Sequence, residues 1–190
     1  MNGELDAFTI VAAVFGIASV FLSTRQNVWS WPTSLVNVTM YTVIFLQQKL
    51  YGLMGIQVFF GLISIYGWYE WLFGGQAKTE LKVSRTSPRL GALLVSIGLA
   101  GWLVLYLVLR ATNDAAPLID AFFFAVSLVG QWMMARKLLE CWPVWVAINL
   151  ISVPFFLLRS DYPTAIQYAV FLGLAVSGWF QWKMSFTKSS

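Results

Sequence analysis

Seven apolar segments, each long enough to cross a lipid bilayer, constrain this chain more than any other feature of its sequence. A helix needs about 20 mostly apolar residues to cross a hydrocarbon core of about 30 Å. Short polar stretches separate the segments, which cover residues 6–23, 28–47, 51–73, 89–109, 117–135, 142–158 and 162–182. The first segment has acidic residues before it and no cleavage signature, so we interpret it as a true span. The pattern predicts an all-α polytopic membrane protein with seven transmembrane helices.

The composition agrees with a membrane protein and excludes several kinds of site. The chain is 59% hydrophobic and 11% charged, with a mean hydropathy of +0.73, whereas about a quarter of the residues of a soluble domain are charged. A single cysteine rules out an intramolecular disulfide, and the lack of histidine rules out histidine catalysis and ordinary zinc or haem sites. We expect no cofactor and no metal. The net charge of +4 needs no nucleic-acid partner, because loop charges that orient the chain account for it.

Lysine and arginine predict how the chain is oriented. With seven spans, nine of the twelve lie on one side and three on the other, namely Lys49, Arg110 and Arg159. Cytoplasmic loops carry an excess of these residues. The count therefore predicts an N-terminus outside and a C-terminus in the cytoplasm.

Self-similarity at a spacing of 111 residues predicts an internal repeat. The matched pairs are Trp31-Pro32 with Trp142-Pro143, Arg25 with Arg136, Tyr51 with Tyr162, and Gly67-Trp-Tyr-Glu-Trp71 with Gly178-Trp-Phe-Gln-Trp182. This spacing covers four spans, an even number, so both copies cross the membrane in the same direction. We expect 3+1+3 parallel repeats: a three-helix repeat over 1–73, a connector and linker helix over 74–116, and a second repeat over 117–190. Transporters of this architecture bind substrate near the midplane between the repeats, whereas a receptor would not need duplicated triplets.

The segment 142–158 carries the strongest candidate binding residues. Trp142, Trp145 and Asn149 stand at i, i+3 and i+7, so one stripe of a helix presents two indoles and one amide. An unpaired amide in hydrocarbon costs several kcal/mol. Two interpretations are open: a hydrogen bond to a neighbouring helix with the tryptophans as anchors, or a pocket wall with aromatic faces for stacking. We favour the pocket for the three residues together.

Other segments carry polar or aromatic side chains at helical spacing. Packing of small and polar residues between helices, with hydrogen bonds of about 1 kcal/mol, explains any single one as well as substrate binding does. Several amides within helices are harder to explain by packing alone, so we place Asn37, Gln57 and Gln131 with the three residues above as substrate-binding. A second rank comprises Ser34, Tyr41, Ser64, Trp68, Ser127, Trp179 and Trp182. For the tryptophans near 67–71 and 178–182, an aromatic belt at the membrane interface is the simpler interpretation.

Acidic groups at membrane depth are scarce. Asp120 is the one carboxylate well inside an apolar run, three residues after Pro117. It can pair with Arg110, cap the start of its helix or face an outer vestibule, and we favour the structural roles. Since the usual groups for proton or sodium coupling are scarce, we predict passive, uncoupled transport. An enzyme would need a nucleophile, metal ligands or paired carboxylates at this depth, so we expect no enzyme activity.

Several motifs resemble the PnuC family of bacterial vitamin transporters. They are Leu50-Tyr51, Gln57-Val-Phe-Phe60, Tyr66-Gly-Trp-Tyr-x-Trp71, Arg136-Lys-x-x-Glu-x-Trp-x-x-Trp145 and Ile148-Asn-Leu-Ile-Ser152. Trp142 and Trp145 match the family's Trp-x-x-Trp and Asn149 the asparagine after it. Asn37 and Gln57 match polar positions, and Gln131 is a weaker match.

The resemblance implies uptake of nicotinamide riboside by facilitated diffusion across the bacterial inner membrane. The implied fold is similar to an enlarged SWEET sugar transporter, and a cytoplasmic kinase would trap the riboside by phosphorylation. Homotrimers occur in the family; the other expected partners are the small-molecule substrate and membrane lipid. Indoles suit the flat cationic ring by cation-π stacking, and Asn or Gln side chains suit its carboxamide and hydroxyls. Relatives carry thiamine, riboflavin or deoxynucleosides, so the substrate stays open, with thiamine, another flat cation, as the alternative.

Overall fold

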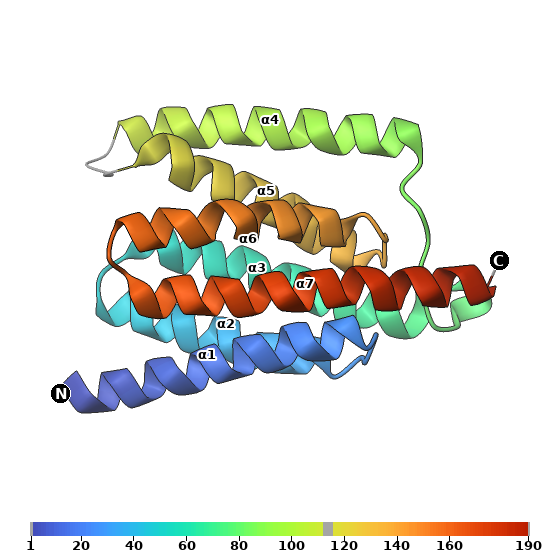
Figure 1. Ribbon diagram of the computed structural model, residues 1–190, viewed down its shortest axis with the longest axis horizontal. Helices are drawn as coiled ribbons and strands as arrows, with labels where there is room; N and C mark the ends of the chain where they lie inside the picture. Colours follow the sequence, from blue (N-terminus) through green and yellow to red (C-terminus); the bar gives the residue numbers. More distant parts are fainter. Residues whose placement is uncertain (1, 112–115, 190) are drawn as a thin grey trace.

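The computed structural model describes residues 2–111 and 116–189, with side chains for 7–50, 53–111 and 116–188, and this part of the chain has the predicted all-α fold (Figure 1). Its long helices are α1 Asn2–Thr24, α2 Ser30–Gln47, α3 Tyr51–Phe73, α4 Pro88–Arg110, α5 Pro117–Ala135, α6 Cys141–Leu158 and α7 Tyr162–Ser189, with a short 3-10 turn at Gln76–Lys78. The Tyr51 side chain of the predicted repeat lies outside the description. So do residues 112–115 of the predicted linker unit.

The helices follow the apolar segments closely. Five of them, α1, α4, α5, α6 and α7, have both the length and the hydropathy to cross a membrane among the described residues. Helices α2 and α3, of 18 and 23 residues, lie alongside them in the same bundle (Figure 1). The largest difference is α7, which continues to Ser189 past the expected end at residue 182. The chain is therefore a multi-pass helical membrane protein.

Six of the seven helices close into a ring. We call α1–α3 the first triplet and α5–α7 the second; within each, consecutive helices pack side by side. Helix α3 packs on α5 and α1 packs on α7, which closes the ring, whereas α4 packs along α5 outside it. The two termini lie at opposite ends of the bundle (Figure 1). The end that holds residues 25–29, 74–87 and 136–140 is called the connector end, and the opposite end, with 48–50 and 159–161, the far end.

Local contacts recur at the 111-residue spacing. Of the six described residues with positive φ, four form two such pairs, Gln26 (54°) with Lys137 (48°) and Lys49 (60°) with Ser160 (59°), and the other two, Ala77 and Lys78, lie in the 3-10 turn. Each of these four residues follows the end of a helix in the left-handed conformation. The backbone N–H of the next residue then donates to the carbonyl oxygen five residues before it, for example Asn27 N to Leu22 O and Leu138 N to Met133 O, both 3.0 Å. These paired contacts support the 3+1+3 parallel repeat, which stays our interpretation of the sequence.

Four buried tryptophans fill the core at the connector end. Trp31 packs edge-on against Trp71, with ring centroids 5.3 Å apart, and Trp142 packs in the same way against Trp182, also at 5.3 Å. Trp71 and Trp182 meet at 5.8 Å between the triplets. None of the four is more than 2% exposed. The triplets are thus in direct aromatic contact at this end.

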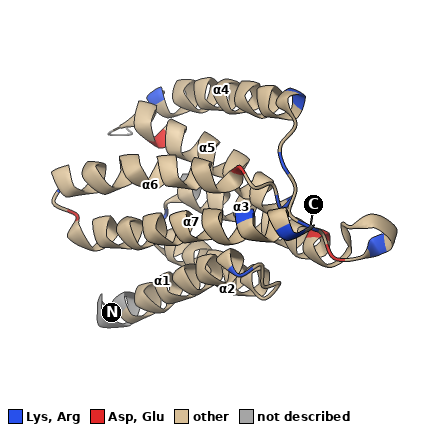
Figure 2. Cartoon of the chain, turned by 45° about the vertical axis from the view of Figure 1, so that its right-hand side comes forward, with Lys and Arg blue, Asp and Glu red and all other residues tan. Residues whose placement is uncertain are grey.

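The connector between α3 and α4 is fastened beneath this aromatic core. Oε2 of Glu140 accepts hydrogen bonds from the backbone N and the Oγ1 of Thr86, both at 2.8 Å. Arg136 forms an ion pair with Glu70 at 2.7 Å and donates to the hydroxyl of Tyr66. Most lysines and arginines gather at this end of the bundle, as Figure 2 shows. The connector end is therefore closed by both apolar packing and a polar layer.

Candidate binding cavity

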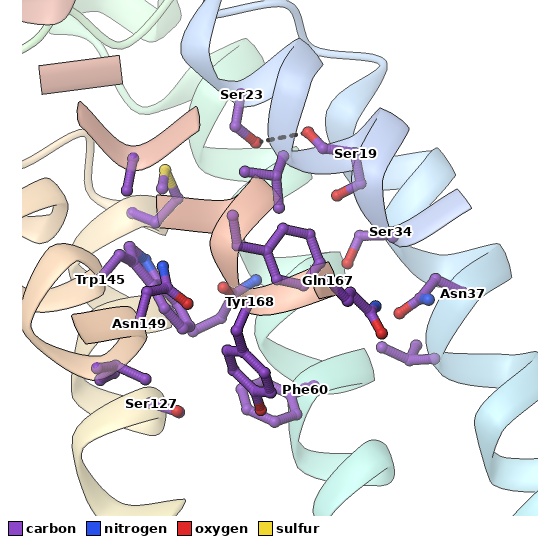
Figure 3. A pocket seen from close by; sticks show the side chains of 18 of the residues that line it. Ser19, Ser23, Ser34, Asn37, Phe60, Ser127, Trp145, Asn149, Gln167 and Tyr168 are labelled. Atoms are coloured by element: carbon purple, nitrogen blue, oxygen red, sulfur yellow. Dashed lines mark hydrogen bonds between the residues drawn. The ribbon is translucent and has the colours of Figure 1, made fainter. Parts of the chain in front are cut away.

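A cavity of about 520 Å³ lies inside the ring. Residues from all six ring helices line it and residues from α4 do not. It runs from Trp31 and Trp142 near the connector end to Phe45 and Thr164 near the far end, and Figure 3 shows the side chains that face it. Its volume suits a small organic molecule.

Helix α6 contributes the wall that the sequence predicts most strongly. Trp142, Trp145 and Asn149 all line the cavity, with Trp145 and Asn149 side by side in Figure 3. Asn149 is 3% exposed, and its amide forms no side-chain hydrogen bond with the described residues. The indole nitrogens of Trp142 and Trp145 are buried and have no hydrogen-bond partner there either. This wall thus holds donors that no described group satisfies.

Helix α2 forms the opposite wall. Ser34, Asn37 and Tyr41 line the cavity as predicted, together with Trp31, whose buried indole nitrogen has no partner among the described residues. The Nδ2 of Asn37 donates to the carbonyl oxygen of Ala12 in α1 at 2.7 Å. The helix-to-helix hydrogen bond, one of the two interpretations for such residues, is therefore present at Asn37, while its side chain still borders the cavity.

Close approach of α1 to α2 depends on Gly16. A Cβ at this position would lie 2.9 Å from the Nδ2 of Asn37, so a larger residue would have to displace the amide. Gly16 also lines the cavity. The glycine thereby sets the position of the Asn37 amide at the cavity wall.

Two further first-rank residues lie on the cavity wall. Gln57 of α3 and Gln131 of α5 both line it, and neither forms a side-chain hydrogen bond with the described residues. Ser127 of the second rank lines it as well. All six residues that the sequence places first therefore share one cavity.

Four second-rank residues lie elsewhere. Trp68 is 38% exposed on the outer surface and Trp182 is fully buried in the aromatic core; Trp179 packs against that core. Ser64 is buried behind the wall, with its Oγ 3.2 Å from the Oγ of Ser34. Tryptophan is common both in the aromatic belt at a membrane interface and in a buried core. Trp182 belongs to the core.

Helix α7 provides a further wall of the cavity, whose residues are not among those predicted from the sequence. Thr164, Gln167 and Tyr168 line the cavity, and Gln167 lies within hydrogen-bonding reach of the Tyr41 hydroxyl. The spacing that predicts the repeat could have identified two of them, because Gln167 lies 110 residues after Gln57 and Tyr168 lies 111 residues after it. Helical spacing alone does not reveal them.

None of the described residues that line the cavity is charged. Asp120 is not among them and lies in the first turn of α5. Across the described residues, no three Cys, Asp or Glu side chains gather in a way that would hold a metal ion. The cavity thus offers aromatic faces, amides and hydroxyls, a set suited to an uncharged or delocalised cationic ligand.

Comparison with known proteins gives a consistent family. Residues 6–184 match the family described as Nicotinamide mononucleotide transporter. The chain is 29% identical to the Nicotinamide riboside transporter PnuC of Escherichia coli, over 94% of this chain and 86% of that protein. It is 25% identical to the Riboflavin/roseoflavin transporter RibM of Streptomyces davaonensis, over 91% and 83%. The crystal structure of the vitamin B3 transporter PnuC has the same fold, with a TM-score of 0.77 and 24% identity over 96% of this chain and 83% of that one.

Proposed function

Since the chain belongs to the nicotinamide mononucleotide transporter family, we propose that it carries nicotinamide riboside into the cell by facilitated diffusion. The substrate-binding residues are Asn37, Gln57, Gln131, Trp142, Trp145 and Asn149, with Trp31 and Tyr168 added from the structure. A cytoplasmic kinase that phosphorylates the riboside would trap it. The protein acts as a carrier and not as an enzyme.

One observation carries the proposal: three tryptophans that line the cavity, Trp31, Trp142 and Trp145, each have a buried indole nitrogen without a partner in the described chain. An indole N–H can only donate a hydrogen bond, and a buried donor without an acceptor is costly. The hydroxyls, ring oxygen and carboxamide oxygen of the riboside are acceptors. The indole faces also suit its cationic ring, since cation-π contacts contribute about 2 kcal/mol in desolvated sites.

The absence of charge on the described cavity wall favours the riboside over the mononucleotide of the family's description. A phosphate group carries a charge between about −1.5 and −2 at neutral pH and binds where Arg or Lys pairs with it. No such residue is among the described lining residues. Phosphorylation would therefore convert a ligand of this cavity into a molecule that it rejects, which is what trapping requires.

The same lining supports uncoupled transport. Coupling to protons or sodium ordinarily uses carboxylates or unwound backbone at membrane depth, and the described wall has no carboxylate. Nine of the twelve basic residues belong to the connector end, so we place that end and the C-terminus in the cytoplasm. The bacterial inner membrane and a homotrimer follow from the resemblance and stay predictions.

Two alternative substrates are riboflavin and thiamine. A riboflavin transporter is among the relatives, and thiamine is, like the riboside, a flat cation. Purified protein in liposomes should take up labelled nicotinamide riboside until the internal and external concentrations are equal. Excess unlabelled riboside should compete, and thiamine, riboflavin and the mononucleotide should compete far less. Accumulation above the external concentration under an ion gradient would exclude facilitated diffusion.

Substitutions connect that assay to the site. Trp145→Ala and Asn149→Ala should abolish uptake and growth on the riboside while the protein remains in the membrane. Trp68→Ala is the matched control, because this tryptophan is exposed on the outer surface. Uptake like that of the unaltered protein in both cavity variants would remove the site assignment.

A further inference from the structure

Two hydrogen bonds join the triplets at the connector end. The indole nitrogen of Trp71 in α3 donates to the carbonyl oxygen of Met134 in α5 at 3.1 Å. The indole nitrogen of Trp182 in α7 donates to the carbonyl oxygen of Ser23 in α1 at 2.9 Å. The two donors are 111 residues apart, and so are the two acceptors. The same bond is therefore made twice, once in each direction between the triplets.

We propose that Trp71 and Trp182 are positioning residues that latch the connector end of the cavity shut, and that both latches release when substrate passes there. The proposal rests on the transport function above, because a latch matters only if this end opens. Neither tryptophan lines the cavity. Each acts through the indole in front of it, Trp31 or Trp142, which does line the cavity.

The geometry of the four rings couples the cavity to the latches. Trp31 meets Trp71 at an interplanar angle of 88° and Trp142 meets Trp182 at 89°. All four rings are buried, so an inner indole that shifts toward a ligand removes an edge contact from the outer one. Trp71 and Trp182 also touch each other, which links the two latches.

The acceptors suit a bond that breaks and re-forms. Ser23 and Met134 lie in the last turns of α1 and α5, and their carbonyl oxygens also accept the backbone N–H of Gln26 and Lys137, both at 3.0 Å. Each carbonyl keeps one partner when the indole leaves. Release therefore leaves no unsatisfied acceptor, and each latch contributes the net strength of a single hydrogen bond.

The single native cysteine reports on this region. Cys141 is fully buried in the same core, with its Sγ 3.9 Å from the Sδ of Met134. Full-length protein in lipid nanodiscs is treated with a small thiol reagent, and the modification rate of Cys141 is followed by mass spectrometry. Trp71→Phe and Trp182→Phe keep an aromatic ring and remove the N–H. Each should raise the rate about fivefold, the effect of one net hydrogen bond on the open fraction.

Trp102→Phe is the matched control. The indole nitrogen of Trp102 in α4 donates to the carbonyl oxygen of Leu118 in α5 at 3.0 Å, so it makes the same kind of bond outside the ring. A general loss of stability should appear in this variant as well, and its thermal unfolding is measured beside the others. If the latch proposal is correct, the modification rate of Cys141 in Trp102→Phe stays within twofold of the rate in the unaltered protein.

The outcomes decide the proposal. An unaltered Cys141 modification rate in either latch variant overturns it, and so does an equal rise of that rate in Trp102→Phe. If one latch variant does not fold, the other carries the test because the two hydrogen bonds are equivalent. Labelling needs no substrate. A protein that labels as expected but does not take up nicotinamide riboside would refute the proposed substrate and leave the latch standing.

Discussion

Gly67 and Gly178 are predicted to be the least replaceable glycines of the ring. An added Cβ at Gly67 would lie 2.5 Å from both Cη2 and Cζ2 of Trp31, and one at Gly178 would lie 2.5 Å from the same atoms of Trp142. Ordinary contacts between carbon atoms are about 3.5–4.0 Å. Each indole would have to move by about 1 Å or more. It has little room, because its other side packs on Trp71 or Trp182.

The magnitude follows from two opposing effects. Replacing a helical glycine by alanine gains up to about 1 kcal/mol where space allows, whereas overpacking a filled core costs about 1–3 kcal/mol, occasionally more. Gly55 in α3 and Gly173 in α7 are matched controls on the same two helices, since an added Cβ would meet nothing within 4 Å at either position. The difference between Gly67→Ala and Gly55→Ala should therefore be about 2–4 kcal/mol, and likewise for Gly178→Ala against Gly173→Ala.

Thermal unfolding in detergent, followed by size-exclusion chromatography of the heated samples, measures this difference. At about 2–4 °C per kcal/mol for a chain of this size, Tm should fall on the order of 10 °C below the matched control. Riboside affinity should fall too, because the displaced indoles line the cavity. Equal Tm values for Gly67→Ala and Gly55→Ala would show that the Trp31 ring does not pack on the α3 backbone as described.

Three further changes test other parts of the structure. Gly16→Ala should weaken riboside binding about tenfold by displacing the Asn37 amide 2.9 Å away, with little change in Tm; an unaltered Kd by calorimetry would contradict this. Burial lowers the pKa of Lys137 to about 8, against the opposing charge of Glu80, so the charged form is disfavoured in the folded protein. Relative to Lys137→Met, the free energy of unfolding should therefore rise by about 3 kcal/mol between pH 8 and 10.5. A difference between the two proteins that stays constant with pH would contradict this. Glu140→Ala removes the acceptor of two 2.8 Å hydrogen bonds from the connector and should cost about 2 kcal/mol, visible as a lower Tm; an unaltered Tm would exclude that contribution.

Much of the fold was predictable because lipid imposes a simple pattern. An apolar run sets where a helix lies, and a polar break sets where it ends; the prediction for α5, 117–135, coincides with the observed helix. Helix α7 was predicted too short because its last turns leave the apolar run yet stay helical as far as Ser189. The apolar run ends at residue 182, whereas the helix continues to Ser189.

Cavity residues were predictable where a polar stripe interrupts an apolar helix. Asn149 and Gln131 stand out because an amide in such a place needs a partner. Tyr168 was missed, since a tyrosine in a membrane helix is equally common at an interface. Trp182 was predicted as a second-rank binding residue, but its indole nitrogen donates to the Ser23 carbonyl oxygen in the core. Only the packing of α7 against α1 reveals this contact. Sequence periodicity identifies the face of a helix but not what lies opposite.

At positions 111 residues apart, the two triplets carry the same side chain in some places and different side chains in others, and the difference follows the cavity. Positions that hold backbone together are the same in both copies: each tryptophan at the cavity's inner end packs on a glycine, and each latch indole bonds a carbonyl of the other triplet. Cavity positions differ at the same spacing, among them Ser34 and Trp145, Gly16 and Ser127, Val20 and Gln131, and Gln57 and Tyr168. Equivalent helix packing in the two triplets requires the same side chains in both, whereas a ligand without two-fold symmetry requires different side chains on the two sides of the cavity. A molecule with a flat ring at one end and a sugar at the other would bind such a cavity in one orientation, with its ring toward the indoles of α6.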